Sequence, residues 1–197
     1  MKSQEFLATV LPSSGKYCAC ELSTAKKEHV FVDTIDELYS NAAQFSEGGL
    51  NAFYALASFN TSGKRLATNA VKIKSLFLDI DCGEGKDYPN KQAAAAALGR
   101  FLSDTSLDTL GTPYVVSSGG GLHIYWPFTE EVDIATWKPV AENLKRLCKK
   151  EGLNIDAMVT GDAARVLRVP DTQNYKQEKP RAVSIKVVGT TFDFNVL

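Results

Sequence analysis

The sequence lacks several features that would place it in a special class of protein. It has no apolar run of the ~18–20 residues that cross a bilayer, and its N-terminus has no signal-peptide stretch. Its four cysteines, at positions 18, 20, 82 and 148, show no disulfide framework. We therefore expect a protein of a reducing, cytoplasmic compartment that does not bind a membrane.

A large net charge and a P-loop motif are also lacking. The formal net charge is -1, so overall charge gives no sign of a polyanionic partner, although a local basic groove remains compatible with it. The pattern G-x-x-x-x-G-K-[ST] is absent, which excludes a P-loop ATPase. We find no repeats and no Gly/Ser linker.

What is present is an ordinary globular composition. A chain of 197 residues with 44% hydrophobic residues can form one sizeable core, or two small lobes that share one. Alternation and apolar runs predict an α+β fold with a mostly antiparallel sheet. The predicted strands are residues 5–11, 17–22, 29–33, 52–59, 72–81, 113–118 and 122–128, with further β structure in 166–169, 181–188 and 191–197.

Three helices are predicted between these strands. Thr34 and Glu37 form a capping box in front of the stripe Ile35, Leu38, Tyr39 and Ala42. A second helix starts near Asn90 and runs through an alanine-rich segment to Leu102. The third carries Trp137, Val140, Leu144, Leu147 and Cys148 at helical spacing, ends at Gly152, and is expected to hold Pro139 in its first turn.

A pair of carboxylates ends the predicted central strand. Asp79 and Asp81 point to the same face, because side chains alternate along a strand, and their Cα atoms lie about 6–7 Å apart. Two like charges side by side repel each other, and a divalent cation would relieve that repulsion. Oxygen ligands suit magnesium or manganese. The alternative is a strand that simply ends at Asp81 before a solvated turn.

A glycine loop joins the next two predicted strands. Gly119, Gly120 and Gly121 exceed what a tight turn needs, and their backbone amides could cradle phosphate oxygens. His123 follows directly and could donate a hydrogen bond to a triphosphate. The alternative is a flexible hairpin followed by a histidine of the core.

A third cluster combines acids, bases and an amide within a short segment. A third carboxylate would complete a metal site, and the basic side chains would neutralise phosphate charge. Asp162 is open as a metal ligand beside Asp156. Singly, each residue also fits a turn cap or a solvated charge. The cluster comprises Asp156, Asp162, Arg165, Arg168, Asn174 and Lys176.

Together these clusters resemble the archaeo-eukaryotic primase superfamily, in particular the primase–polymerase domains of phages and plasmids. Its first motif corresponds to Leu76–Asp81 and its second to Ser117–His123. Its third corresponds to Ile155 and Asp156, followed by Arg168, Asn174 and Lys176; cellular primases have histidine where this chain has Asn174. The resemblance covers about half of the chain.

The resemblance implies a DNA primase or polymerase that transfers nucleotides from nucleoside triphosphates on a single-stranded DNA template. Asp79, Asp81 and Asp156 would hold two Mg²⁺ or Mn²⁺ ions. The triphosphate would contact Ser117, Gly119, Gly120, Gly121, His123, Arg168, Asn174 and Lys176. Lys64 and Arg65 are further candidate contacts with template or nucleotide.

The resemblance also carries expectations about architecture and setting. A primase-type core would have an antiparallel central sheet flanked by helices, with a smaller N-terminal α/β lobe (1–70) and an RRM-like catalytic lobe (71–197) in one catalytic domain. Relatives often precede a helicase, so the chain could be excised from a longer protein, with a helicase in the same or a partner chain. If phage-encoded, it would act in the host cytoplasm.

Two other functions stay open. A metal-dependent nuclease also needs clustered carboxylates, but it has no use for a triphosphate pocket. A non-catalytic DNA-binding replication protein is the second; a nicking initiator would want a tyrosine nucleophile and two histidines close together, whereas His29 and His123 are far apart. Cys18, Cys20 and His29 lack usual zinc-module spacing, and we interpret them as structural.

Overall fold

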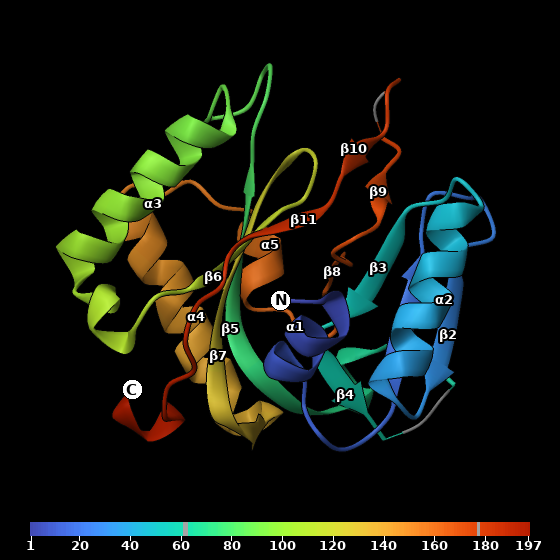
Figure 1. The fold of residues 1–197 in the computed structure, drawn as a ribbon. Helices are drawn as coiled ribbons and strands as arrows, with labels where there is room; N and C mark the ends of the chain where they lie inside the picture. The colour runs from blue at the N-terminus through green and yellow to red at the C-terminus, as the bar shows by residue number, and fades with distance from the viewer. Residues whose placement is uncertain (61–62, 177) are drawn as a thin grey trace.

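The computed structural model describes residues 1–60, 63–176 and 178–197 (Figure 1). Its helices are α1 (Ser3–Val10), α2 (Ile35–Glu47), α3 (Lys91–Thr105), α4 (Ile134–Lys150) and α5 (Ala157–Thr160). Its strands are β1 (Tyr17–Glu21), β2 (Glu28–Val32), β3 (Ala52–Ala55), β4 (Ala57–Phe59), β5 (Ala70–Asp81), β6 (Tyr114–Ser117), β7 (Gly121–Asp133), β8 (Val166–Arg168), β9 (Gln173–Asn174), β10 (Arg181–Ala182) and β11 (Ser184–Val187). Three short 3-10 turns cover Ala67–Asn69, Leu107–Leu110 and Phe194–Val196.

Two antiparallel sheets form the framework. The larger has the order β11-β6-β7-β5-β4 and the smaller the order β2-β1-β3-β8, while β9 and β10 form a separate ribbon. The chain crosses from one sheet to the other between β3 and β4, at Leu56. The hydroxyls of Tyr54 and Tyr125, 3.0 Å apart and buried, join the two sheets.

The helices pack against both faces and the edges of this framework. Phe6 of α1 meets Tyr125 of β7 edge-on at 5.2 Å between ring centroids. Helix α3 lies beside the larger sheet (Figure 1), and it lines a hollow there together with Leu122 of β7. Trp137 of α4 stacks on Phe77 of β5. Helix α2 packs on the smaller sheet and buries Leu38 and Ala42.

The structure confirms the α+β fold with antiparallel sheets flanked by helices. Strands β1, β2, β5, β6, β7 and β8, and helices α2, α3 and α4, lie close to their predicted ranges. The capping box is present: Thr34 N donates to Glu37 at 3.1 Å and Glu37 N donates to Thr34 Oγ1 at 3.2 Å. The Asn90 side chain caps α3 by accepting a hydrogen bond from Ala93 N.

Two strand predictions near the N-terminus are wrong. Residues 5–11 belong largely to helix α1, because Phe6, Leu7 and Val10 recur at helical spacing and are fully buried. A short apolar run does not distinguish a buried helix from a strand by itself. Residues 52–59 form two strands instead of one, since the backbone N–H of Leu56 leaves the ladder and donates to Arg165 O at 3.1 Å.

Two further expectations are wrong in detail. Helix α4 begins at Ile134, so Pro139 lies in its second turn rather than its first. In 191–197, only Phe192 makes a β-bridge, to Phe128, and a 3-10 turn follows it. The rings of Phe192 and Phe194 both pack on Phe128, which explains the apolar pattern without a strand.

The division at residue 70 into two lobes stays a prediction. Strands β4 and β8 pair across that point, β4 with β5 and β8 with β3. Among the described residues, none of the helices has the length and apolar character needed to cross a membrane.

Candidate active site

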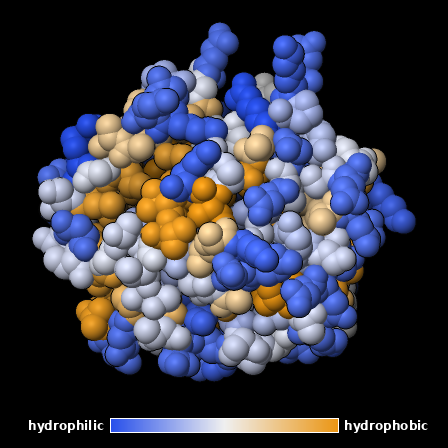
Figure 2. Space-filling view, viewed as in Figure 1, coloured by the Kyte–Doolittle hydropathy of each residue, from blue (hydrophilic) through white to orange (hydrophobic). Residues whose placement is uncertain are grey.

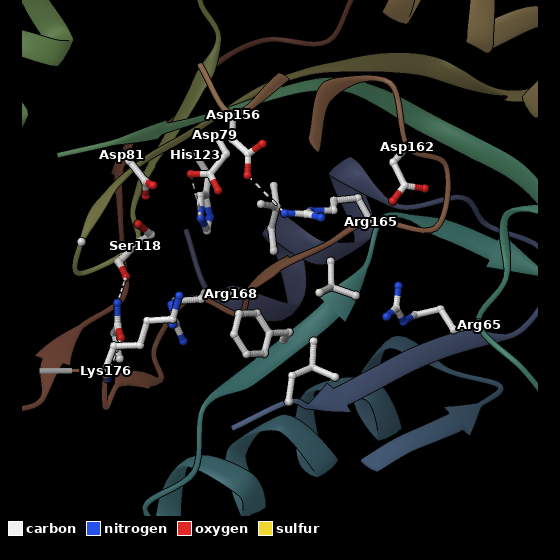
Figure 3. A pocket seen from close by; sticks show the side chains of 16 residues that line it. Arg65, Asp79, Asp81, Ser118, His123, Asp156, Asp162, Arg165, Arg168 and Lys176 are labelled. Atoms are coloured by element: carbon white, nitrogen blue, oxygen red, sulfur yellow. Dashed lines mark hydrogen bonds and ion pairs between the residues drawn. The ribbon is translucent and has the colours of Figure 1, made fainter. Parts of the chain in front are cut away.

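A cavity of about 410 Å³ opens where the two sheets meet, beside the end of β5. Four aspartates, three arginines, one histidine and one lysine line it, together with a smaller apolar part (Figure 3). The lining consists of Leu22, Phe53, Arg65, Asp79, Asp81, Ser118, Gly120, His123, Asp156, Asp162, Arg165, Val166, Leu167, Arg168, Asn174 and Lys176.

Three carboxylates lie on one side of this cavity. Asp79 and Asp81 both point into it from β5, as strand alternation predicts, and Asp156 joins them from the start of α5 (Figure 3). The Asp156 N–H donates to Asp79 O at 2.8 Å, which fixes the third residue beside the first two. The structure therefore brings together the three predicted metal-ligating residues.

Two cations of the chain neutralise the outer carboxylates. Lys86 Nζ lies 2.8 Å from Asp81 Oδ2, and Arg165 Nη2 lies 3.2 Å from Asp156 Oδ2. Asp79 has a weaker partner: among the described residues, the only basic nitrogen within ion-pair distance is His123 Nε2, at 3.7 Å. The central carboxylate is the least compensated of the three.

The electrostatics of Asp79 follow from this position. Burial, followed by the negative charges of Asp81 and Asp156, raises the pKa of its carboxyl to about 7, against the opposing charges of Arg165 and Lys176. Asp79 is thus near its titration point at neutral pH. A cation that enters the cavity would displace a proton here easily.

His123 stands directly across from Asp79 in the β5–β7 ladder. Its ring is buried, and burial together with the charge of Arg168 lowers its pKa to about 3, so the imidazole is neutral. Its Nδ1 is buried without a hydrogen-bond partner among the described residues. A neutral imidazole with unused hydrogen-bonding capacity fits a ligand-contacting role better than a purely structural one.

Arg168 of β8 supplies a fixed positive charge on the opposite side. Its Nη1 donates to Asn51 Oδ1 at 2.6 Å, and its guanidinium lies over the Phe53 ring, 4.5 Å from the centroid. Burial lowers its pKa to about 10, which leaves it charged at neutral pH. Its stacked, hydrogen-bonded guanidinium is preorganised to bind an anion.

The glycine loop closes one end of the cavity. Gly119 has φ +83°, which favours glycine, and only Gly120 of the three glycines lines the cavity. Gly121 belongs to β7, where a Cβ would collide with the carbonyl oxygen of Ile80. The Asn174 side chain holds the loop by donating to Ser118 O at 2.9 Å, and its Oδ1 accepts from Lys176 N at 3.0 Å.

Ser117, like Gly119 and Gly121, is a predicted nucleotide-binding residue that does not line this cavity. It pairs with Leu122 across the hairpin, whereas His123 pairs with Val116, so Ser117 and His123 face opposite sides of the sheet. The Ser117 hydroxyl accepts a hydrogen bond from Lys91 Nζ at 2.6 Å. Ser118, one residue later, lines the cavity instead.

Several residues of the site were not predicted from the sequence. Phe53 in β3 and Asn51 just before that strand both contact Arg168, and no motif marks either residue. Ser118 lay next to the predicted serine, and only the hairpin register distinguishes the two. Arg65, a predicted contact with template or nucleotide, lines the cavity, whereas Lys64, predicted with it, does not.

Asp162 lies apart from the other three aspartates, near Arg65 (Figure 3). Its Oδ1 accepts a hydrogen bond from Ala164 N at 2.9 Å, so it caps a turn. Asp156, in contrast, is close enough to Asp79 to raise its pKa. The geometry favours Asp156 over Asp162 as the third carboxylate.

Cys18 and Cys20 lie in a small buried cluster with Ala55 and Phe59, with their sulfur atoms 3.6 Å apart. His29 pairs with Cys20 across the β1–β2 ladder. Among the described residues, no group of three His, Cys, Asp or Glu side chains is arranged to hold a metal ion, here or at the carboxylates.

The sequence matches no protein-family profile and no curated protein. Solved structures do match. The AEP domain of the cyanophage S-2L primase–polymerase aligns with a TM-score of 0.57 and 14% identity, over 91% of this chain and 85% of that one. The chain has the fold of an archaeo-eukaryotic primase catalytic domain.

Two further structures share this primase fold. The polymerase domain of Mycobacterium tuberculosis ligase D, solved in complex with DNA, aligns with a TM-score of 0.51 and 16% identity, over 86% of this chain and 62% of that one. Primase RepB′ aligns with a TM-score of 0.55 and 11% identity, over 94% and 56%. The chain thus spans less than two thirds of these two proteins.

Proposed function

We propose that this chain is a DNA primase or polymerase domain that transfers nucleotides from nucleoside triphosphates to a strand on a single-stranded DNA template. The observation that carries the proposal is the juxtaposition in one cavity of Asp79, Asp81 and Asp156 with the fixed cation Arg168. The primase fold supports the same chemistry, because the structures it resembles are described as primases and polymerases.

The donor set suits divalent metal. Three carboxylates would supply hard oxygen ligands, and a bound cation would reverse the raised pKa of the half-buried Asp79. Lys86 and Arg165 now pair with Asp81 and Asp156, and both would have to release them. When bound, Mg²⁺ or Mn²⁺ would make the attacking 3′-hydroxyl more acidic and neutralise charge on the phosphates.

The chain's own residues have separate roles in this proposal. Arg168 binds the triphosphate through a guanidinium that is already oriented, so little entropy is lost on binding. His123, neutral and buried, donates one hydrogen bond to a phosphate oxygen. Lys176 and Arg165 add positive charge at the rim of the cavity. Asn174 keeps the glycine loop in place.

The test is template-dependent nucleotide incorporation. The protein is incubated with labelled single-stranded DNA, with and without an annealed primer, nucleoside triphosphates and Mn²⁺ or Mg²⁺. Replacing Asp79 or Asp81 by asparagine should lower incorporation by about 100-fold or more, because each carboxylate is proposed to bind metal directly. Ribo- and deoxynucleotides are compared in parallel reactions.

Two variants serve as controls. Asp104→Asn changes an exposed carboxylate of α3 and should leave incorporation unchanged. Asp162→Asn should retain most activity, because Asp162 caps a turn instead of joining the other three. Degradation of the DNA without nucleotides would favour a nuclease, and DNA binding without any product would favour a non-catalytic protein. Either result would overturn the proposal.

A further inference from the structure

A second and larger hollow, of about 820 Å³, lies away from the carboxylates. It runs between helix α3 and the strands β6 and β11, on the face of the sheet opposite His123. Figure 2 shows apolar residues gathered over this area, bordered by hydrophilic ones. We refer to it as the α3–β11 groove. It has no part in the function proposed above.

The floor and walls of the groove are aliphatic. Leu98 and Leu102 come from α3, Val115 and Leu122 from the sheet, and Val187 from the edge strand. Val187 and its neighbour Val188 are 38% and 54% exposed. A contiguous apolar area of this kind on a protein surface typically marks a site of interaction.

Helix α3 is shaped to leave this space open. Ala95 and Gly99 present almost no side chain toward the groove, and a Cβ added at Gly99 would meet no atom within 4 Å. Glycine in a helix interior costs roughly 0.5–1 kcal/mol relative to alanine. This destabilising glycine lies at a position where a larger side chain would fill the groove.

Positive charge surrounds the groove and is not neutralised by carboxylates. Lys91, Arg181 and Lys186 line it, whereas no Asp or Glu does among the described lining residues. None of the three makes an ion pair in the described structure; Lys91 instead donates to Ser117 Oγ at 2.6 Å. Burial lowers the pKa of Lys91, and the charges of Arg181 and Lys186 lower it further.

We infer that the α3–β11 groove docks an acidic polypeptide segment with aliphatic side chains, contributed by a partner protein. Leucine, isoleucine or valine side chains would fill the space above Gly99, and flanking Asp or Glu residues would pair with Lys91, Arg181 and Lys186. Grooves with apolar floors and charged rims recognise peptides in this way.

A peptide fits the groove better than a nucleic acid does. Single-stranded nucleic acid needs aromatic side chains on which its bases stack, and the described walls contain none. The cations stand at the rim, while the apolar floor is broad. A phosphate backbone would pair with the cations at the rim but leave the apolar floor exposed to water. An acidic aliphatic segment would pair with the cations and also cover the floor.

The experiment selects peptides from a displayed library of random 12-residue sequences on the 197-residue chain. Enriched peptides are synthesised, and their dissociation constants are measured by fluorescence polarisation. We expect sequences that combine Asp or Glu with Leu, Ile or Val. Gly99→Glu should weaken their binding about ten-fold or more, by filling the groove and repelling acid, and Lys186→Glu roughly five-fold.

Matched variants separate charge, space and folding. Gly99→Gln fills the groove without charge and should weaken binding less than Gly99→Glu does. Both replace a helical glycine, so thermal stability should rise, and lost binding cannot be ascribed to unfolding. Lys149→Glu, on α4, should leave binding unchanged.

Four outcomes would overturn the inference. In the first, the library gives no binding peptides. In the second, the binding peptides lack acidic residues. In the third, their dissociation constants are unchanged by the Gly99 and Lys186 substitutions. The fourth is a different occupant. A single-stranded oligonucleotide that competes with the peptide and loses affinity with Lys186→Glu would identify a nucleic-acid site. A dimer in light scattering that Gly99→Glu dissociates would identify a second copy of the chain.

Discussion

At the scale of residues, Asp79 is a carboxyl group whose surroundings disfavour its charged form. Burial and two neighbouring carboxylates raise its pKa from 3.8 to about 7. An acid whose pKa is higher in the folded than in the unfolded state binds more protons when folded. Its ionisation therefore lowers stability as pH rises from about 4 to about 7, and the loss persists above that range.

Replacing Asp79 by asparagine should stabilise the metal-free protein at alkaline pH. The shift corresponds to at most about 4 kcal/mol at pH 8, and the gain should shrink toward zero as pH falls to about 4. Urea unfolding in a chelator, followed by tryptophan fluorescence, measures it. A gain that is the same at pH 4 and pH 8, or a loss at pH 8, would contradict the assigned pKa.

The unfolding free energy of the variant must be compared with that of wild type at each pH, because the titration of His123 changes stability in the opposite direction. Its pKa falls from 6.5 to about 3 on folding, so its contribution to stability is complete above pH 6.5 and is lost as pH falls toward 3. In the wild type the two effects partly cancel between pH 4 and 6.5. Subtracting the two pH profiles removes the part of the His123 contribution that both proteins share.

Sequence reasoning located the chemistry of single residues better than their supports. Asp79 and Asp81 share a face because strand alternation is a local rule, and the structure bears this out. Ser117 faces the other way because hairpin register decides its side, and register depends on which residues pair across the loop. Asn51 supports Arg168 from a distant segment, which no local pattern indicates.

At the scale of elements, helix α4 contains a residue that opposes its own geometry. Pro139 lies in the second turn, where it has no N–H for the carbonyl of Ala135 and its ring crowds that carbonyl. The rest of the helix compensates, since Trp137 is fully buried and its indole N–H donates to Ser75 O at 3.1 Å. Tertiary packing thus maintains a helix that local propensity disfavours.

Pro139→Ala should therefore stabilise the protein. Pro139 is exposed, so its replacement removes little packing, and the expected gain in unfolding free energy is about 1–3 kcal/mol. Chemical denaturation of the two proteins measures the difference. Lys149→Ala in the same helix is the control and should change stability by less than about 0.5 kcal/mol. A destabilised Pro139→Ala variant would show that the proline fixes a bend the fold requires.

The elements that sequence reasoning predicted correctly carry strong local signals. Helix α2 has a capping box, α3 has an asparagine cap with alanines behind it, and β5 is a long apolar strand. Helix α1 was predicted as a strand, because its short apolar run is compatible with a buried strand as well as with a buried helix. The break at Leu56 was missed because it depends on pairing with Arg165, more than a hundred positions away.

At the scale of the whole molecule, the site exists only where the two sheets meet. β5 and β7 of the larger sheet supply Asp79, Asp81 and His123, while β8 of the smaller sheet supplies Arg168. The β3–β8 pairing sets the distance between the carboxylates and the cation. That pairing joins segments far apart in the chain, which is why spacing along the sequence predicted the residues but not their arrangement.

Divalent metal should stabilise the whole fold if the three carboxylates bind it. At 100 times its dissociation constant, a ligand that binds only the folded state adds about 2.7 kcal/mol, which corresponds to a rise of roughly 5–10 °C in Tm at this chain length. Differential scanning calorimetry at pH 8 with Mn²⁺ should show this rise for wild type and for Asp104→Asn.

The rise in Tm should vanish in Asp79→Asn, which lacks the Asp79 charge whose repulsion with the other carboxylates the metal relieves. The rise should also be smaller at pH 5, where Asp79 is largely protonated. These two dependences distinguish metal at the carboxylates from metal bound elsewhere on the surface, which would respond to neither. They are independent of nucleotide incorporation. A protein that binds Mn²⁺ in this way yet incorporates nothing would retain the metal site and lose the proposed activity, and equal shifts in wild type and Asp79→Asn would remove the metal site itself.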